Sequence, residues 1–178
     1  MLASSPNNSP PHPIGIGLMK YRLVTSLPDA MVVRKLRNGC AEFMTNYSAQ
    51  IGVWQQIRWY WKQYRRERRA GIFRVYLFFD ERQKPVGYGA LQLRGEQLLV
   101  TECVEGALRG RGRGRAILTT LIQIARAERR ALVADIFATN AASIALHEHL
   151  GFQMVSTRVE NNRELRTYIL AANIDRDK

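Results

Sequence analysis

A segment at residues 109–114 alternates arginine with glycine, a pattern that could bind phosphate. An apolar run precedes it and a helical pattern follows it, which predicts a turn between a strand and a helix. Alternating glycines let the backbone N–H groups of such a turn point inward together, and the helix dipole and arginine side chains add positive charge. We therefore expect phosphate to bind at Arg109, Gly110, Arg111, Gly112, Arg113 and Gly114.

Two common phosphate-binding spacings do not fit this segment. A P-loop continues with lysine and then serine or threonine, whereas Arg115 and Ala116 follow Gly114 here. A dinucleotide fingerprint reads G-x-G-x-x-G, and Ile117 stands where a count from Gly112 needs the third glycine. The spacing that fits is R-x-x-G-x-G. Disordered RNA-binding segments also repeat arginine and glycine, but they lack a flanking strand and helix.

A second segment, about 30 residues further on, has the residues of a capped helix. Asn140 is a good N-cap and Gly151 a good C-cap residue, and an apolar run at 132–137 predicts a buried strand before them. Ser143 and His147 are four residues apart, so they share one helical face with Asn140.

Together the two segments resemble motifs A and B of the GNAT superfamily of N-acetyltransferases, over residues 85–155 and more loosely over 20–170. The resemblance implies that acetyl-CoA is the co-substrate and that 109–114 holds its pyrophosphate. It also implies that the strand backbone near Val104, with Asn140 and Ser143, contacts the pantetheine arm. Two positions depart from the usual pattern, because Gly106 replaces a proline and His147 replaces a tyrosine.

Glu102 and His147 are the candidate catalytic residues. The family tyrosine is expected to protonate the departing thiolate, and histidine can do the same because it exchanges protons near neutral pH. Glu102 interrupts an apolar strand, where a carboxylate is costly unless it is paired, so it is a candidate general base. The alternative for Glu102 is a salt bridge to an arginine, in which case water takes the proton from the amine. The alternative for His147 is a packing role. Glu105 is a weaker candidate because it is expected to face away.

The two cysteines are too few for a disulfide framework or a zinc site. Cys103 alternates to the opposite face of its strand from Glu102, so we expect a buried, inert thiol there. His149 lies on another helical face from His147, and no third ligand-type residue clusters with these two. No metal is expected.

Hydrophobic periodicity predicts one β-α-α-β-β-β-α-β-α-β-β domain at 18–172, between tails at 1–17 and 173–178. The predicted strands lie at 20–25, 72–79, 86–93, 98–104, 132–137, 152–160 and 164–170, and the helices at 28–38, 50–69, 116–130 and 141–150. This order matches the α/β (α+β) GNAT fold, a mixed and mostly antiparallel sheet of about six or seven strands with helices on both faces.

The helix predicted at 50–69 carries aromatic and basic residues with no assigned role. Four residues at spacings of three and four predict a core-facing stripe, namely Trp54, Ile57, Trp61 and Tyr64. Trp59 and Tyr60 fall off that stripe and are predicted to line a cleft. The basic run at 65–69 is interpreted as a solvated helix end, with attraction of an anionic acceptor or nucleic acid as the alternative.

Composition limits the setting of the protein. The chain has 178 residues and a formal net charge of +12. No apolar run approaches the ~20 residues that span a membrane, and the N-terminus lacks a signal-peptide pattern, so we expect a cytoplasmic protein without membrane contact. The oligomeric state is expected to be a monomer or a homodimer.

The expected function is transfer of an acetyl group from acetyl-CoA to a primary amine, directly, in a ternary complex. The segments 36–38 and 44–48 faintly resemble amino-sugar-nucleotide N-acetyltransferases, and the basic surface suits an anionic acceptor. The acceptor is expected to be either a nucleotide sugar or a protein amine, and the sequence does not choose between them. Nucleic acid is a less favoured partner. The alternative is a catalytically impaired CoA-binding module with a basic surface for nucleic acid.

Overall fold

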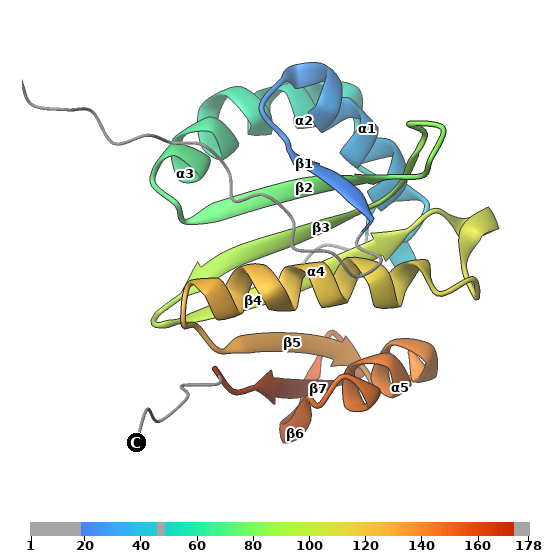
Figure 1. The fold of residues 1–178 in the computed structure, drawn as a ribbon, viewed down its shortest axis with the longest axis vertical. Coiled ribbons are helices and arrows are strands. Elements are labelled where there is room, and N and C mark those ends of the chain that lie inside the picture. The colour runs from blue at the N-terminus through green and yellow to red at the C-terminus, as the bar shows by residue number, and fades with distance from the viewer. Residues whose placement is uncertain (1–18, 46–48, 173–178) are drawn as a thin grey trace, which may run out of the picture.

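The computed structural model describes residues 19–45 and 49–172, and it shows a seven-stranded sheet with helices on both faces (Figure 1). The strands are β1 Lys20–Leu23, β2 Phe73–Phe79, β3 Pro85–Arg94, β4 Gln97–Val104, β5 Leu132–Phe137, β6 Gln153–Glu160 and β7 Arg163–Leu170. The helices are α1 Leu27–Asn38, α2 Val53–Trp59, α3 Arg65–Arg69, α4 Arg113–Ala127 and α5 Ala141–His149, with short 3₁₀ turns at Ala41–Phe43 and Gly106–Leu108. The predicted fold class is confirmed, and the predicted tails at 1–17 and 173–178 lie outside the described residues.

The strand order is β1-β2-β3-β4-β5-β7-β6, and the central pair β4–β5 is the parallel one. These two strands pair only at Leu98↔Leu132 and Leu99↔Val133. β4 nevertheless continues to Val104 and β5 to Phe137. The two strands therefore diverge and leave a split in the middle of the sheet, where their backbone groups do not pair with each other.

Each face of the sheet has its own hydrophobic core. Ile117 and Leu121 of α4 pack with Val100 of β4 on one face. On the other face, Tyr64 and Cys103 belong to the core beneath α1 and α2. Because side chains alternate along a strand, Glu102 follows Val100 onto the α4 face, and Thr101 follows Cys103 onto the α1 face. The split thus has different side chains on its two sides.

The predicted aromatic stripe on the second helix is wrong at Trp54 and Trp61 and confirmed at Tyr64. Trp54 and Trp61 are 81% and 53% exposed, whereas Gln56, Tyr60 and Tyr64 face the core. A π-helical turn at Tyr60–Tyr64 joins α2 to α3, and it inserts a residue into the helical repeat. After residue 59, residues that are three or four positions apart therefore no longer lie on the same face of the helix.

The two tyrosines of this turn are tied to the core by their hydroxyls. Tyr60 donates to the carbonyl of Thr25 at 2.6 Å, and Tyr64 donates to the carbonyl of Val24 at 2.9 Å. Burial raises the pKa of Tyr64 far above its usual range, which keeps this hydroxyl protonated. Tyr60 is thus a core residue and not the cleft residue that was predicted.

Cys103 is bonded to Cys40, so the prediction of a free thiol is wrong. Its predicted burial is confirmed, with 4% of the residue exposed. The chain leaving α1 carries Cys40 onto the face of β4 to which Cys103 points, across a separation of 63 residues.

Replacing Cys40 by serine is expected to lower the free energy of unfolding by about 2–4 kcal/mol under non-reducing conditions, because the bond restricts the unfolded chain. Urea denaturation of both proteins, with and without dithiothreitol, measures the effect. Reductant should lower the free energy of unfolding of the parent protein to nearly that of the variant and leave that of the variant unchanged. Equal stability of the two proteins without reductant would contradict a disulfide.

Candidate active site

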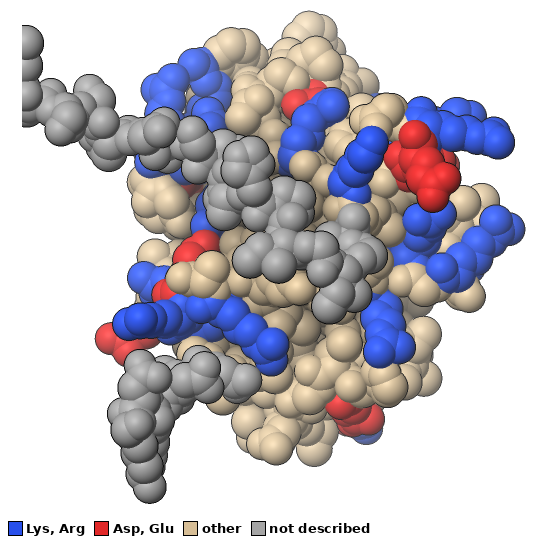
Figure 2. All heavy atoms as spheres, viewed as in Figure 1, with Lys and Arg blue, Asp and Glu red and all other residues tan. Residues whose placement is uncertain are grey.

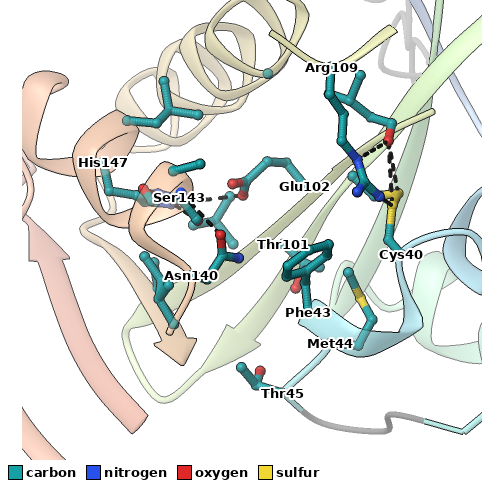
Figure 3. Close-up of a pocket in the computed structure, with 18 of the residues that line it drawn as sticks. Cys40, Phe43, Met44, Thr45, Thr101, Glu102, Arg109, Asn140, Ser143 and His147 are labelled. Carbon is teal, nitrogen blue, oxygen red and sulfur yellow. Dashed lines mark hydrogen bonds and ion pairs between the residues drawn. A yellow bond between two sulfur atoms is a disulfide. The ribbon is translucent and has the colours of Figure 1, made fainter. Parts of the chain in front are cut away.

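A cavity of about 400 Å³ lies in the split between β4 and β5. Phe43, Met44 and Thr101 line it from the α1 side, and Glu102 and His147 line it from the α4 and α5 side (Figure 3). The predicted phosphate-binding turn lines it as well. One cavity therefore joins the turn, the two candidate catalytic residues and the side chains that line it from the α1 side.

The turn at 109–114 has the backbone expected of a phosphate cradle. Gly110 and Gly112 have φ angles of +72° and +73°, which glycine adopts without steric cost. Gly112 is the N-cap of α4, so the helix begins at Arg113, earlier than predicted. The N–H groups of the first helical turn have no partner within the helix and are available to an anion. The cavity wall includes Gly110, Gly112 and Gly114 but neither Arg111 nor Arg113.

The side chain of Arg109 folds back onto the protein. Its Nη2 donates to the carbonyl of Gly39 at 3.1 Å and lies 3.2 Å from Sγ of Cys40. Its Nε donates to the carbonyl of Val104 at 3.4 Å, and the guanidinium lies over the ring of Phe43 (Figure 3). Arg109 thus ties the cradle to the end of α1, a contact that the sequence did not indicate.

His147 is buried, and its Nδ1 lies within hydrogen-bond distance of both the carbonyl and the hydroxyl of Ser143. It is 1% exposed and lies edge-on to the ring of Phe152. Its Nδ1 lies 2.8 Å from the carbonyl oxygen of Ser143, which can only accept, so Nδ1 carries a proton. The other ring nitrogen, Nε2, is therefore the atom that can exchange a proton with the cavity.

Glu102 and His147 face each other across the cavity. Oε2 of Glu102 lies 3.8 Å from Nε2 of His147 (Figure 3). Within the described part of the chain, that Nε2 is buried without a hydrogen-bond partner. The structure therefore brings together the two residues that were predicted separately as base and acid. Glu105, the weaker candidate, is exposed and absent from the cavity wall.

The N-terminus of α5 is built as the sequence predicted. Oδ1 of Asn140 accepts a hydrogen bond from the backbone N–H of Ser143 at 3.2 Å. Asn140, Ser143 and His147 all line the cavity, so the predicted shared face is confirmed. Val104 lines the same cavity at the end of β4. Their contacts with the pantetheine arm stay a prediction.

A second cavity of about 250 Å³ lies between α1, α2 and strands β2–β4. It shares Met44 and Thr101 with the first cavity, so the two adjoin at the split. Trp59 lines it, which confirms the predicted cleft role of that residue. Tyr88 also lines it, and burial raises the pKa of its hydroxyl far above the usual range, with Arg37 opposing the shift and Glu102 reinforcing it.

Basic side chains lie well beyond the two cavities. Figure 2 shows Lys and Arg spread over one face of the molecule, with fewer Asp and Glu. The run at 65–69 forms α3 and lines neither cavity, and Arg65 lies over the exposed ring of Trp61. Within the described ranges, no helix is both long enough and apolar enough to cross a membrane.

Comparisons with known proteins identify the relatives of this chain. A sequence model described as Acetyltransferase (GNAT) family matches residues 37–152, which include the cradle, Glu102 and His147. A comparison with curated proteins finds no match.

Solved structures share the fold over most of the chain. The yncA protein of Salmonella typhimurium, solved with acetyl-CoA, has a TM-score of 0.71 and 23% identity, covering 87% of this chain and 94% of that one. A ribosomal-protein-alanine N-acetyltransferase of Brucella melitensis has a TM-score of 0.69 and 25% identity, covering 86% and 99%. A spermidine N-acetyltransferase of Vibrio cholerae, solved with CoA and spermine, has a TM-score of 0.76 and 11% identity, covering 88% and 97%.

Proposed function

Because the chain belongs to the GNAT family of acetyltransferases, we propose that it transfers the acetyl group of acetyl-CoA directly to a primary amine held at the β4–β5 split. The single observation that carries this proposal is the cavity that joins the cradle to the Glu102–His147 pair. A donor in the cradle and an acceptor from the α1 side would meet at that pair. Holding both reactants in one site lowers the entropic part of the barrier.

The cradle fits the pyrophosphate of acetyl-CoA. A Cβ atom built on Gly110 or Gly112 would meet no atom within 4 Å, so a phosphate can approach the backbone closely. The cradle N–H groups and the α4 dipole would bind it, while Arg109 holds the turn in place. The backbone N–H groups of β4 that face β5 beyond Leu99 do not pair with that strand, and they are suited to polarise the thioester carbonyl.

The Glu102–His147 pair can balance the protons of the reaction. The amine nitrogen forms a bond to the thioester carbon and the C–S bond breaks. Glu102 accepts the proton that the amine loses, directly or through water, and Nε2 of His147 donates a proton to the departing sulfur. A side-chain rotation that closes the 3.8 Å between Oε2 and Nε2 to hydrogen-bond distance would return the proton from Glu102 to His147 before the next turnover.

The proposed activity is tested by measuring free thiol released from acetyl-CoA in the presence of an amine panel of amino acids, polyamines, peptides, nucleotide sugars and tRNA. Amine-dependent thiol release is the expected result. Binding of CoA without release for any acceptor, together with salt-sensitive RNA binding, would favour the impaired CoA-binding module instead.

Replacing Gly112 by alanine is expected to weaken CoA binding by about 5- to 30-fold, because the left-handed conformation is costly for a residue with a Cβ. Calorimetric titration with CoA measures the change. Gly106→Ala is the matched control, since it adds the same methyl group where no atom lies within 4 Å and outside the cavity wall. Equal affinities of the two variants would place the pyrophosphate elsewhere.

The fold does not select the acceptor. The names of the structural relatives give spermidine for one protein and a ribosomal-protein alanine for another. A nucleotide sugar or a protein amine was expected from the sequence, and neither expectation has been tested. The chemistry of the second cavity is a more direct guide, because this cavity adjoins the Glu102–His147 site at Thr101.

A further inference from the structure

We infer that the acceptor is a small primary amine with an anionic group, and that the anion binds Arg34 and Arg37 in the second cavity. The inference rests on the proposed acetyl transfer and names its substrate class. It assigns a specificity role to two arginines of α1, of which only Arg37 lies in a segment that the sequence resemblance included.

The position of the second cavity suits an acceptor. It lies on the α1 face of the sheet, opposite α4, and it meets the first cavity at Met44 and Thr101. An amine that extends past Thr101 would enter the split between β4 and β5, where Glu102 lies. The rest of that molecule would stay in the second cavity, so the residues there decide which acceptors bind.

The charge of the second cavity is positive. Arg34 and Arg37 both line it, and none of the described residues in its wall is acidic. Arg37 is 8% exposed. A carboxylate or phosphonate bound by both guanidinium groups would accept charge-assisted hydrogen bonds from them.

The hydrogen bonds of Arg34 leave room for an anion. Its Nη1 donates to the carbonyl of Ile51 at 2.9 Å, which fixes the guanidinium beneath the chain that enters α2. Its Nη2 donates to no residue within the described part of the chain. Arg37 is held in the same way, with Nη1 donating to the carbonyl of Ala49 at 3.0 Å. Both side chains are therefore positioned before an acceptor arrives.

The size and lining of the cavity limit the body of the acceptor. A volume of about 250 Å³ lies below the ~300–1,000 Å³ of pockets for drug-sized ligands, so it suits a molecule about as large as an amino acid. Part of the lining is apolar and aromatic and consists of Trp59, Phe73 and Val75. A nucleotide sugar exceeds this volume, and the arginines repel a polyamine.

The test compares amines that differ only in the anionic group. Thiol release at saturating acetyl-CoA is measured for the standard L-amino acids against their carboxamides, and for 2-aminoethylphosphonate against ethanolamine. We expect at least one anionic amine to be a substrate, with kcat/KM about 10- to 100-fold above that of its neutral partner.

Variants then assign the selectivity to the arginines. Arg34→Met should raise KM for the anionic substrate by about 10- to 100-fold and leave the neutral analogue within about twofold, and Arg34→Lys should restore part of the difference. Arg58→Met is the matched control, because it removes the same charge from an exposed site on α2 outside both cavities. Arg37→Met should behave as Arg34→Met does.

Four results would overturn the inference. An equal loss for the anionic and neutral amines in Arg34→Met would show that the arginine only holds the chain before α2. Neutral amines that match their anionic partners would remove the anion site. Turnover with peptides, tRNA or polyamines and with no small anionic amine would refute this substrate class while leaving acetyl transfer intact, whereas no turnover with any acceptor would refute both.

Discussion

Removing Nε2 of His147 is expected to lower kcat by about 10²- to 10⁴-fold, the usual contribution of a positioned general acid. Two variants remove this atom in different ways. His147→Asn can retain the donor to the Ser143 carbonyl but leaves space beside Phe152, whereas His147→Phe fills the space but lacks the donor. A similar loss in both would therefore come from the missing Nε2 and not from packing.

The same variants should bind CoA with unchanged affinity, because the cradle lies on a different element from His147. Thiol release gives kcat, calorimetry gives the dissociation constant of CoA, and thermal melting reports on folding. His149→Asn is the control, since His149 is exposed on the same helix. Turnover above about half of the parent value in either His147 variant would remove this histidine from proton transfer and leave water as the acid.

Most of the donor side of the site could be predicted from the sequence because it is local. The strand β5 matches its predicted bounds, and the cap of α5 places Asn140, Ser143 and His147 on one face as the spacing required. Glycine, asparagine and a four-residue spacing each determine backbone or side-chain geometry over a single turn.

The parts that the sequence did not reveal depend on contacts between distant segments. The pairing of Cys40 with Cys103 and the fold-back of Arg109 onto Gly39 both join α1 to the β4 region, and no short-range pattern encodes them. The aromatic stripe failed at Trp61 for a different reason, because the π-turn at 60–64 changes the helical repeat on which the prediction relied. The exposure of Trp54, which precedes this turn in α2, is not explained by it. A binding role for Arg34 likewise could be inferred only from the cavity that it lines.

The Glu102–His147 contact underlies the proposed proton transfer. Only 13% of the Glu102 side chain is exposed, and Nε2 of His147, which has no hydrogen-bond partner within the described residues, lies 3.8 Å from its Oε2. A family member with tyrosine at this position would place a hydroxyl there. Histidine differs because its ring can both accept a proton from the carboxyl and donate one to sulfur, so the departure from the motif supports a coupled pair.

If the pair works as one unit, removing its second member should cost little once the first is gone. Glu102→Gln keeps the shape of the side chain and is expected to lower kcat/KM by about 10²-fold or more, because the base is lost. The double variant Glu102→Gln/His147→Asn should then be no slower than the slower single variant, since groups that act together are not additive in their kinetic effects.

Thiol release at several acceptor concentrations gives kcat/KM for the four proteins of this cycle. Glu105→Gln is the matched control, because it makes the same change at an exposed position just beyond β4. A double variant whose loss equals the product of the two single losses would mean that the residues act independently. In that case the 3.8 Å contact would be a packing feature, and water would have to carry the proton between the amine and the thiolate.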